Sequence, residues 1–506
     1  DAAGGDGHRA VGVQADGYGV GNIPLATFLA EGGKDVPTFV QPFFTLPPLQ
    51  RREFCFIIKL YFCVKGVPHG KTKNQKPPFA LRALAAFAVT LAALFVLLLA
   101  AYALPGEPVR DHVYDSAVKI ADEGLYPEYL NFKLFQMDNY TDTIMLTEAA
   151  SADEAPPLTA MMTNTAYNVD NFETLADDLQ WYIERDWATG AQRTDAPALV
   201  PFSYARYWHG YLIWLRPLLL VTDITGVRVV QYLVLAALFA AVAVLLRRRC
   251  GLRAAVWFAV SQLLVTAFWA PHQVQFFTCF AVAYAGCVWV LAKPRRSDDV
   301  CLALLVLGVV TSFCDLLVTP VLTLGLPLAC WLLEPQQRLR AGTRQCGIVV
   351  GGSLTWGVGY LLCWASKWVL AGLVTGQNVI ADALHQVGVR TAADSWHGME
   401  LTWGNILHFV YTTLAGKHLF WPLVLAVVLL LALFAASIRD RQQLARALPL
   451  GLCALMTPAW FIALRTHSIQ HGWFTWRALG LTVFAGLAFL YYCCDVRQIA
   501  KRLKRT

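Results

Sequence analysis

Two aspartates four residues apart open the longest polar stretch of the chain. Asp111 and Asp115 lie in PGEPVRDHVYDSAVKIADEG, and in a helix this spacing places both carboxylates on one face. Val113, Ala117 and Ile120 form an apolar stripe, which predicts an amphipathic helix lying along a membrane surface. Paired carboxylates in such a place suit a general base or a divalent-cation site. The alternative interpretation is a solvated acidic helix, because the whole stretch is acidic.

Three cationic side chains interrupt an aromatic-rich segment, PFSYARYWHGYLIWLRPL, at residues 201–218. They are Arg206, His209 and Arg216. An arginine near a membrane surface can hold a phosphate through two parallel hydrogen bonds. We therefore predict that these three residues bind substrate. The alternative is that they anchor the segment in the aromatic belt of the membrane interface.

One aspartate stands within an apolar run. Asp315 occurs in LLVLGVVTSFCDLLVTPVLTLGLPL, and an ionisable residue at membrane depth is costly and usually functional. We assign it to the substrate-binding group. It could instead cap a helix end at the interface.

The segment RTHSIQHGWFTWR contains four further cationic candidates. Arg465, His467, His471 and Arg477 fall within 13 residues, and this composition favours a site for a phosphate or diphosphate. Histidines four residues apart share a helical face and could bind metal. No third ligand stands nearby, so we predict no metal site. Interfacial anchoring by the tryptophans is the alternative.

The composition shows what kind of protein carries these residues. Of the 506 residues, 57% are hydrophobic and only 15% are charged, whereas a soluble domain has about 25% charged residues. This excludes a disordered chain, a coiled coil and a soluble nucleic-acid-binding protein. We predict an all-α polytopic membrane protein that contacts membrane lipids and binds no nucleic acid.

About ten segments are long and apolar enough to suggest transmembrane helices. They are residues 79–104, 226–246, 252–271, 273–292, 299–314, 318–334, 346–366, 418–437, 446–464 and 476–494.

Basic residues fix the predicted orientation of these spans. Lysines and arginines cluster before the first span and after the second, fourth, sixth, eighth and tenth. Because basic loops stay in the cytoplasm, both termini should be cytoplasmic in a multi-pass protein of the plasma membrane. We expect residues 1–78 to form a cytoplasmic tail, 79–494 the membrane domain and 495–506 a basic tail. The loops 105–208 and 367–417 then face outward, and they mark the active face.

This layout resembles the GT-C class of integral-membrane glycosyltransferases. A cytoplasmic N-terminus, one span and a large acidic outward loop are shared with that class, over roughly residues 79–494. The segments RYWHGYLIWLRPLL, TSFCDLLVTPVLTLGLPL and THSIQHGWFTWR also resemble those of uncharacterised bacterial polytopic membrane proteins. The chain departs from the class in having ten predicted spans rather than eleven or more, and a D-x-x-x-D spacing where many members have adjacent acidic residues.

The resemblance implies a reaction. A sugar would pass from a lipid-linked, polyprenyl-phosphate donor to a glycan or lipid acceptor of the cell envelope. Asp111 or Asp115 would be the base, and Arg465, His467, His471 and Arg477 would lie near the donor phosphate. No cofactor is required, although two carboxylates could hold Mg²⁺ or Mn²⁺.

A transporter or flippase for a lipid-linked glycan is the alternative function. It would need polar residues along a path through the bilayer, for which Asp315, Arg216 and Lys367 are candidates. In the enzyme, the acidic pair, Asp315 and the 467–477 segment should instead converge on one outward cavity.

Overall fold

A computed structural model describes most of the chain after residue 76. The described residues are 77–124, 126–129, 135–169, 199–340, 342–391, 395–396, 399–406, 408, 428 and 441–494. The chain divides into two units, Asp1–Pro77 and Pro78–Thr506, and the structure below is that of the second. The predicted tails 1–78 and 495–506 and the predicted span 418–437 fall wholly or almost wholly outside the described residues.

Seven helical segments in the described part of the chain are long and apolar enough to cross a membrane, so the chain is a helical multi-pass membrane protein. They are α3 (Phe79–Tyr102), α9 (Ile224–Cys250), α11 (Val274–Ala292), α12 (Ser297–Cys314), α15 (Gly342–Thr375), α18 (Arg441–Ala463) and the segment Gly472–Cys493. The last comprises α20 (Gly472–Thr475), η6 (Trp476–Ala478) and α21 (Leu479–Cys493).

Two predicted spans form shorter helices than expected. The 252–271 segment forms α10 (Leu252–Leu264) and then η5 (Ala267–His272), because Thr266 adopts a left-handed conformation with φ of 52°. The 318–334 segment forms only α13 (Val321–Leu332), which follows Pro320. A helix needs about 20 residues to cross a bilayer, so neither reaches the length of a span.

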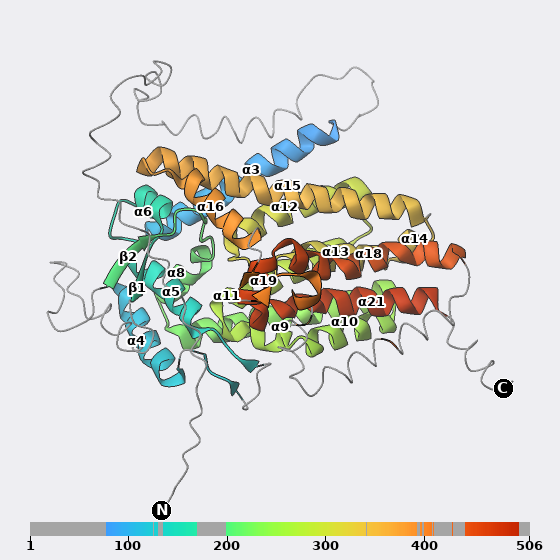
Figure 1. Cartoon of the computed structure of the whole chain (residues 1–506), viewed down its shortest axis with the longest axis horizontal. Coiled ribbons are helices and arrows are strands. Elements are labelled where there is room, and N and C mark those ends of the chain that lie inside the picture. Colours follow the sequence, from blue (N-terminus) through green and yellow to red (C-terminus); the bar gives the residue numbers. More distant parts are fainter. Residues whose placement is uncertain are drawn as a thin grey trace, which may run out of the picture. The chain divides into compact units, whose positions relative to one another are not determined.

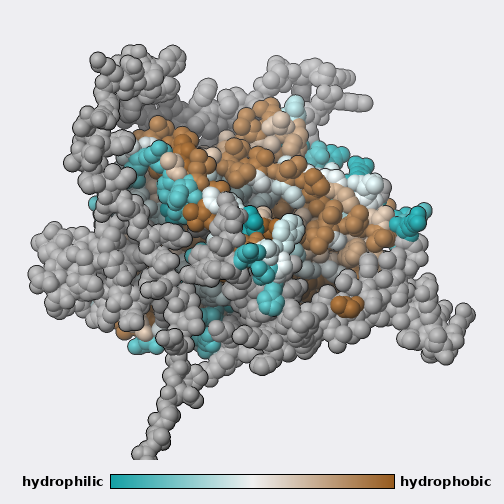
Figure 2. All heavy atoms as spheres, viewed as in Figure 1, coloured by the Kyte–Doolittle hydropathy of each residue, from teal (hydrophilic) through white to brown (hydrophobic). Residues whose placement is uncertain are grey.

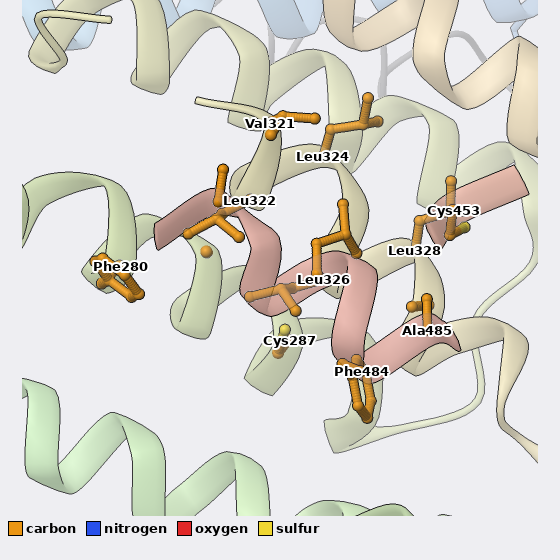
Figure 3. Packing of buried hydrophobic residues seen from close by; sticks show 14 of the residues in the cluster. Phe280, Cys287, Val321, Leu322, Leu324, Leu326, Leu328, Cys453, Phe484 and Ala485 are labelled. Carbon is orange, nitrogen blue, oxygen red and sulfur yellow. The ribbon is translucent and has the colours of Figure 1, made fainter. Parts of the chain in front are cut away.

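Helix α13 lies in the middle of the larger apolar core. All 12 of its residues are buried, and Figure 3 shows its leucines beside Phe280 and Cys287 of α11, Cys453 of α18 and Phe484 of α21. The outer helices differ: on α3 only Leu98, Ala101 and Tyr102 are buried. Apolar residues also cover much of the part of the surface that is coloured in Figure 2. This arrangement fits helices whose outer sides contact lipid.

The segment between the first two spans folds into its own group of elements. It contains α4 (Glu107–Glu123), α5 (Asn139–Ser151), α6 (Pro157–Thr163), strand β1 (Thr165–Val169), strand β2 (Leu199–Ser203) and α8 (Leu212–Leu219). Figure 1 shows these elements together at one end of the helices, which we call the α4 end. The helices α16 (Val379–Thr391) and α19 (Arg465–Gln470) pack against each other, and the short α14 (Pro335–Arg338) lies at the other end.

The all-α prediction misses two small sheets. Strands β1 and β2 pair antiparallel, with Thr165 opposite Ser203, and β3 (Ser395–Trp396) pairs with β4 (Met399–Glu400). The rest of the described chain is mainly helical.

Small residues let α12 and α15 approach closely, as is common between membrane helices. A Cβ added at Gly308 would lie 2.2 Å from the carbonyl oxygen of Trp356, and one at Gly359 would lie 2.3 Å from that of Leu305. Real Cβ atoms essentially never come this close to another atom.

We expect Gly359→Ala to destabilise the protein by about 1–3 kcal/mol, the usual cost of overpacking. The control is Gly357→Ala on the same helix, where an added Cβ meets nothing within 4 Å. Thermal unfolding of both variants in detergent would check this. Equal midpoints for the two variants would contradict the close approach of α12 and α15.

Candidate functional site

A buried carboxylate lies at the centre of the α4 end. Glu148 belongs to α5, whose start is capped by the Asp138 side chain accepting from the Thr141 amide. Glu148 is only 2% exposed. Its Oε2 accepts a hydrogen bond from the Tyr211 hydroxyl and lies 2.7 Å from Nδ1 of His209. Burial and the charge of Glu148 raise the pKa of Tyr211, so this phenol stays protonated and remains a donor.

His209 is held in a strained backbone conformation. It is a non-glycine residue with φ of 52°, and such residues persist where the surrounding structure fixes them. The fixing contacts come from its neighbours: the Gly210 amide donates to the Phe313 carbonyl at 2.8 Å, and the Trp208 ring stacks on Phe313 at 4.7 Å. The last turn of α12, which contains Phe313, therefore positions His209 beside Glu148.

A small polar pocket adjoins Glu148. Its volume is about 20 Å³, enough for roughly one water molecule or one hydroxyl group. The residues that line it come from α3, α5, α6 and β1 and the turn between α5 and α6: Tyr102, Glu148, Ser151, Ala152, Glu154, Ala155, Ala160, Thr163 and Thr165. The Tyr102 hydroxyl donates to Oδ1 of Asn164 at 2.8 Å, which fixes one wall.

Two buried cations support this site through backbone carbonyls. Arg216 donates to the carbonyls of Ala149 and Leu104 at 3.0 and 2.8 Å. Lys367 of α15 donates to the carbonyl of Met161 at 2.6 Å. Both side chains are fully buried. Arg216 of α8 therefore joins α5 to the turn after α3, and Lys367 joins α6 to α15. Substrate binding by Arg216 stays a prediction.

The predicted residue Asp315 lies close to the predicted residue His467. Asp315 accepts from the Val318 amide at 3.2 Å, as a capping residue does, and Nε2 of His467 lies 3.0 Å from the Leu317 carbonyl. Leu317 is another non-glycine residue with positive φ, at 66°. His467 therefore contacts the turn that Asp315 caps, while the expected convergence of the acidic pair, Asp315 and the 467–477 segment on one cavity stays a prediction.

The remaining predicted cations contact aromatic rings, a backbone carbonyl or an aspartate. The His471 ring centroid is 4.7 Å from that of His467, and the buried Arg477 lies over the Phe276 ring at 4.7 Å. Arg465 donates to the Thr391 carbonyl at 3.3 Å. Arg206 pairs with Asp382 of α16 at 3.2 Å and lies over the Tyr204 ring.

The predicted acidic pair lies on the exposed face of α4. Asp111 and Asp115 are both exposed, whereas Val113, Ala117 and Ile120 are buried. The predicted helix and its apolar stripe are thus confirmed. No hydrogen bond joins either aspartate to the Glu148 cluster within the described residues.

Helix α4 nevertheless reaches the rim of the pocket. Arg110 donates to both carboxylate oxygens of Asp153 at 2.7 and 2.8 Å, and Asp153 stands between the lining residues Ala152 and Glu154. Asp111 follows Arg110 in the chain, whereas Asp115 lies a turn further along the helix.

A second polar cluster ties α4 to α9. Arg228 forms a bidentate pair with Glu123 and also donates to the His272 carbonyl at 3.0 Å. The Tyr129 hydroxyl lies 2.9 Å from Nε2 of His272. Close by, the buried carboxylate of Asp142 accepts from the amides that begin α11, and burial raises its pKa to about 7.

Sequence reasoning missed Glu148, Tyr211, Tyr102 and Asn164. A signal was present for Glu148, because it is the single charge in TIMLTEAAS. No comparable signal exists for the others. Their roles depend on contacts between residues that are distant in sequence, such as Tyr102 with Asn164.

Among the residues whose side chains the structure places, no group of three or more His, Cys, Asp or Glu could hold a metal ion. His467 and His471 contact each other without a third such ligand in that part of the chain.

No family model matches the chain, and neither a curated protein nor a solved structure matches it. The function must therefore be argued from the residues at the α4 end.

The His272 cluster predicts a pH dependence of stability. Burial and the charge of Arg228 lower the pKa of His272 from 6.5 to about 4. Between these values the unfolded chain binds a proton that the folded chain does not, so stability falls as the pH falls. We expect a loss of about 2–3 kcal/mol between about pH 7 and about pH 4.5 from this group.

The comparison is between the wild type and His272→Gln, each unfolded thermally at both pH values. Gln cannot titrate, so the wild-type protein should lose more stability on acidification. Equal losses of stability on acidification in the two proteins would show that His272 does not contribute to the pH dependence.

Proposed function

We propose that the chain is a GT-C type glycosyltransferase of the plasma membrane. It transfers a sugar from a polyprenyl-phosphate donor to a cell-envelope acceptor at the outer face, and both termini are cytoplasmic. The observation that carries this proposal is the folding of the first interspan segment around a polar pocket beside the buried Glu148. Loops placed on a rigid helical scaffold are where catalytic groups usually lie.

In the proposed reaction, Asp111 or Asp115 takes the proton from an acceptor hydroxyl. The hydroxyl oxygen bonds to the anomeric carbon, and the bond from that carbon to the phosphate oxygen breaks. The phosphate leaves with the electron pair and is stabilised by cations. Arg206 and Arg465 are partly accessible and suit this role, whereas Arg477 is only 1% exposed. No step requires a cofactor.

Two bonding patterns favour the enzyme over a flippase. A flippase needs polar side chains that meet its cargo, and Arg216 and Lys367 were candidates. Both are bonded to backbone carbonyls and fully buried. Asp315 is occupied in capping the turn that follows α12.

We expect Asp111→Asn or Asp115→Asn to lower sugar transfer by about 10²–10⁴-fold, the usual contribution of a general base. Asp111 is the favoured position because Arg110 joins α4 to the pocket rim. The assay follows labelled sugar from polyprenyl phosphate into acceptor in membranes with matched amounts of protein. Glu107→Gln, which removes another exposed carboxylate of α4, is the control and should keep full activity.

Two results would contradict the proposal. The first is that wild-type membranes transfer no more sugar than membranes without the chain, over a panel of lipid donors. This would rule out the proposed transferase function. Full activity in both aspartate variants would place the base elsewhere.

A further inference from the structure

Glu148 has an oxygen to which the described residues supply no hydrogen bond. Its Oε2 is shared by Tyr211 and His209. Its Oε1 is buried and has no partner among the described residues, and the same is true of Nε2 of His209. A buried carboxylate oxygen without a partner is costly. The cost is removed if a bound group donates a hydrogen bond to it.

Cationic and hydroxyl side chains surround Glu148. Lys367 of α15 interacts with it electrostatically, and His209 is within ion-pairing distance. Arg216 of α8 lies near Tyr102, which in turn interacts with Glu148, as does Tyr211. The Tyr211 hydroxyl already donates to Oε2, and a carboxylate oxygen accepts hydrogen bonds, so the missing partner of Oε1 is a donor.

The pocket restricts the donor to a small neutral group. Its volume of about 20 Å³ admits roughly one water-sized group. An anion would be repelled by Glu148 and by Glu154, which also lines the pocket. Around it, Tyr102, Ser151, Thr163 and Thr165 carry hydroxyl oxygens able to accept, and the first three already donate within the protein. A hydroxyl group, which has one donor and two acceptor positions, meets these conditions.

We propose that this pocket, named the Glu148 pocket, binds one hydroxyl group of a sugar or polyol substrate, which donates a hydrogen bond to Oε1 of Glu148. The inference rests on the proposed function, because the substrate is the donor sugar or the acceptor of that reaction. The pocket holds the ligand through one hydroxyl, and Asp111 follows Arg110, which contacts Asp153 at the pocket rim.

The experiment measures transfer kinetics with the full chain purified into lipid nanodiscs. Glu148→Gln keeps the size of the side chain and removes its charge. We expect it to raise the KM for one substrate by about ten- to a hundredfold, the effect of losing a hydrogen bond to a charged group, with a much smaller change in kcat. The substrate whose KM rises, donor or acceptor, is the one that the pocket holds.

A second variant tests the pocket without touching the carboxylate. Ala155 lines the pocket and is partly exposed, so Ala155→Leu should fill the space and raise the same KM, even if Glu148→Gln does not fold. Glu107→Gln is the matched control and should leave both KM values unchanged. Unchanged KM values in every folded variant would overturn the proposal. They would mean that the pocket holds only a water molecule.

Failure of the proposed function would be recognised separately. If the wild type transfers no sugar, thermal unfolding with and without methyl glucoside tests whether the Glu148 pocket binds a hydroxyl group. Polyols stabilise proteins in general by exclusion from their surface, so only an excess stabilisation of the wild type over Glu148→Gln and Ala155→Leu supports binding. Equal stabilisation of all three proteins overturns it.

Discussion

Burying charged side chains is the constraint on which the α4 end depends. A buried charge is tolerated only when hydrogen bonds replace those that water made. Lys367 and Arg216 meet this condition by donating to the carbonyls of Met161, Ala149 and Leu104. These bonds join the interspan segment to the membrane helices, so the elements around Glu148 are held by the same contacts that make the buried cations tolerable.

The strained residues of this region depend on that rigidity. His209 and Leu317 both have positive φ, a conformation that costs of order 1–3 kcal/mol for a residue other than glycine. Each is held by the neighbouring loop or helix: the Gly210 amide bonds to the Phe313 carbonyl, and His467 bonds to the Leu317 carbonyl. The strain therefore lies in two loops, of which the one carrying His209 contacts Glu148.

Hydropathy and helical periodicity predicted the local features but not the long-range pairs. The seven long apolar helices and the buried stripe of α4 follow from residue order along one segment. The shortness of α13 does not, because its burial by other helices removes the need for a lipid-spanning length. Glu148 is 63 residues from Tyr211, and no periodicity links residues so far apart. Asp111 and Asp115 lie off the buried stripe of α4, so their exposure follows from local spacing, but that spacing says nothing of the distant residues around Glu148.

Exposed and buried carboxylates suit different tasks in one reaction. A base has to release its proton to water after each turnover, which favours an exposed residue such as Asp111. A group that orients substrate gains from burial, because a hydrogen bond to a charge is stronger where water is excluded. Glu148 has this second environment, with Tyr211 and His209 fixing the carboxylate. The contact between Arg110 and Asp153 links the two environments, since it joins the helix that carries Asp111 to the rim of the Glu148 pocket.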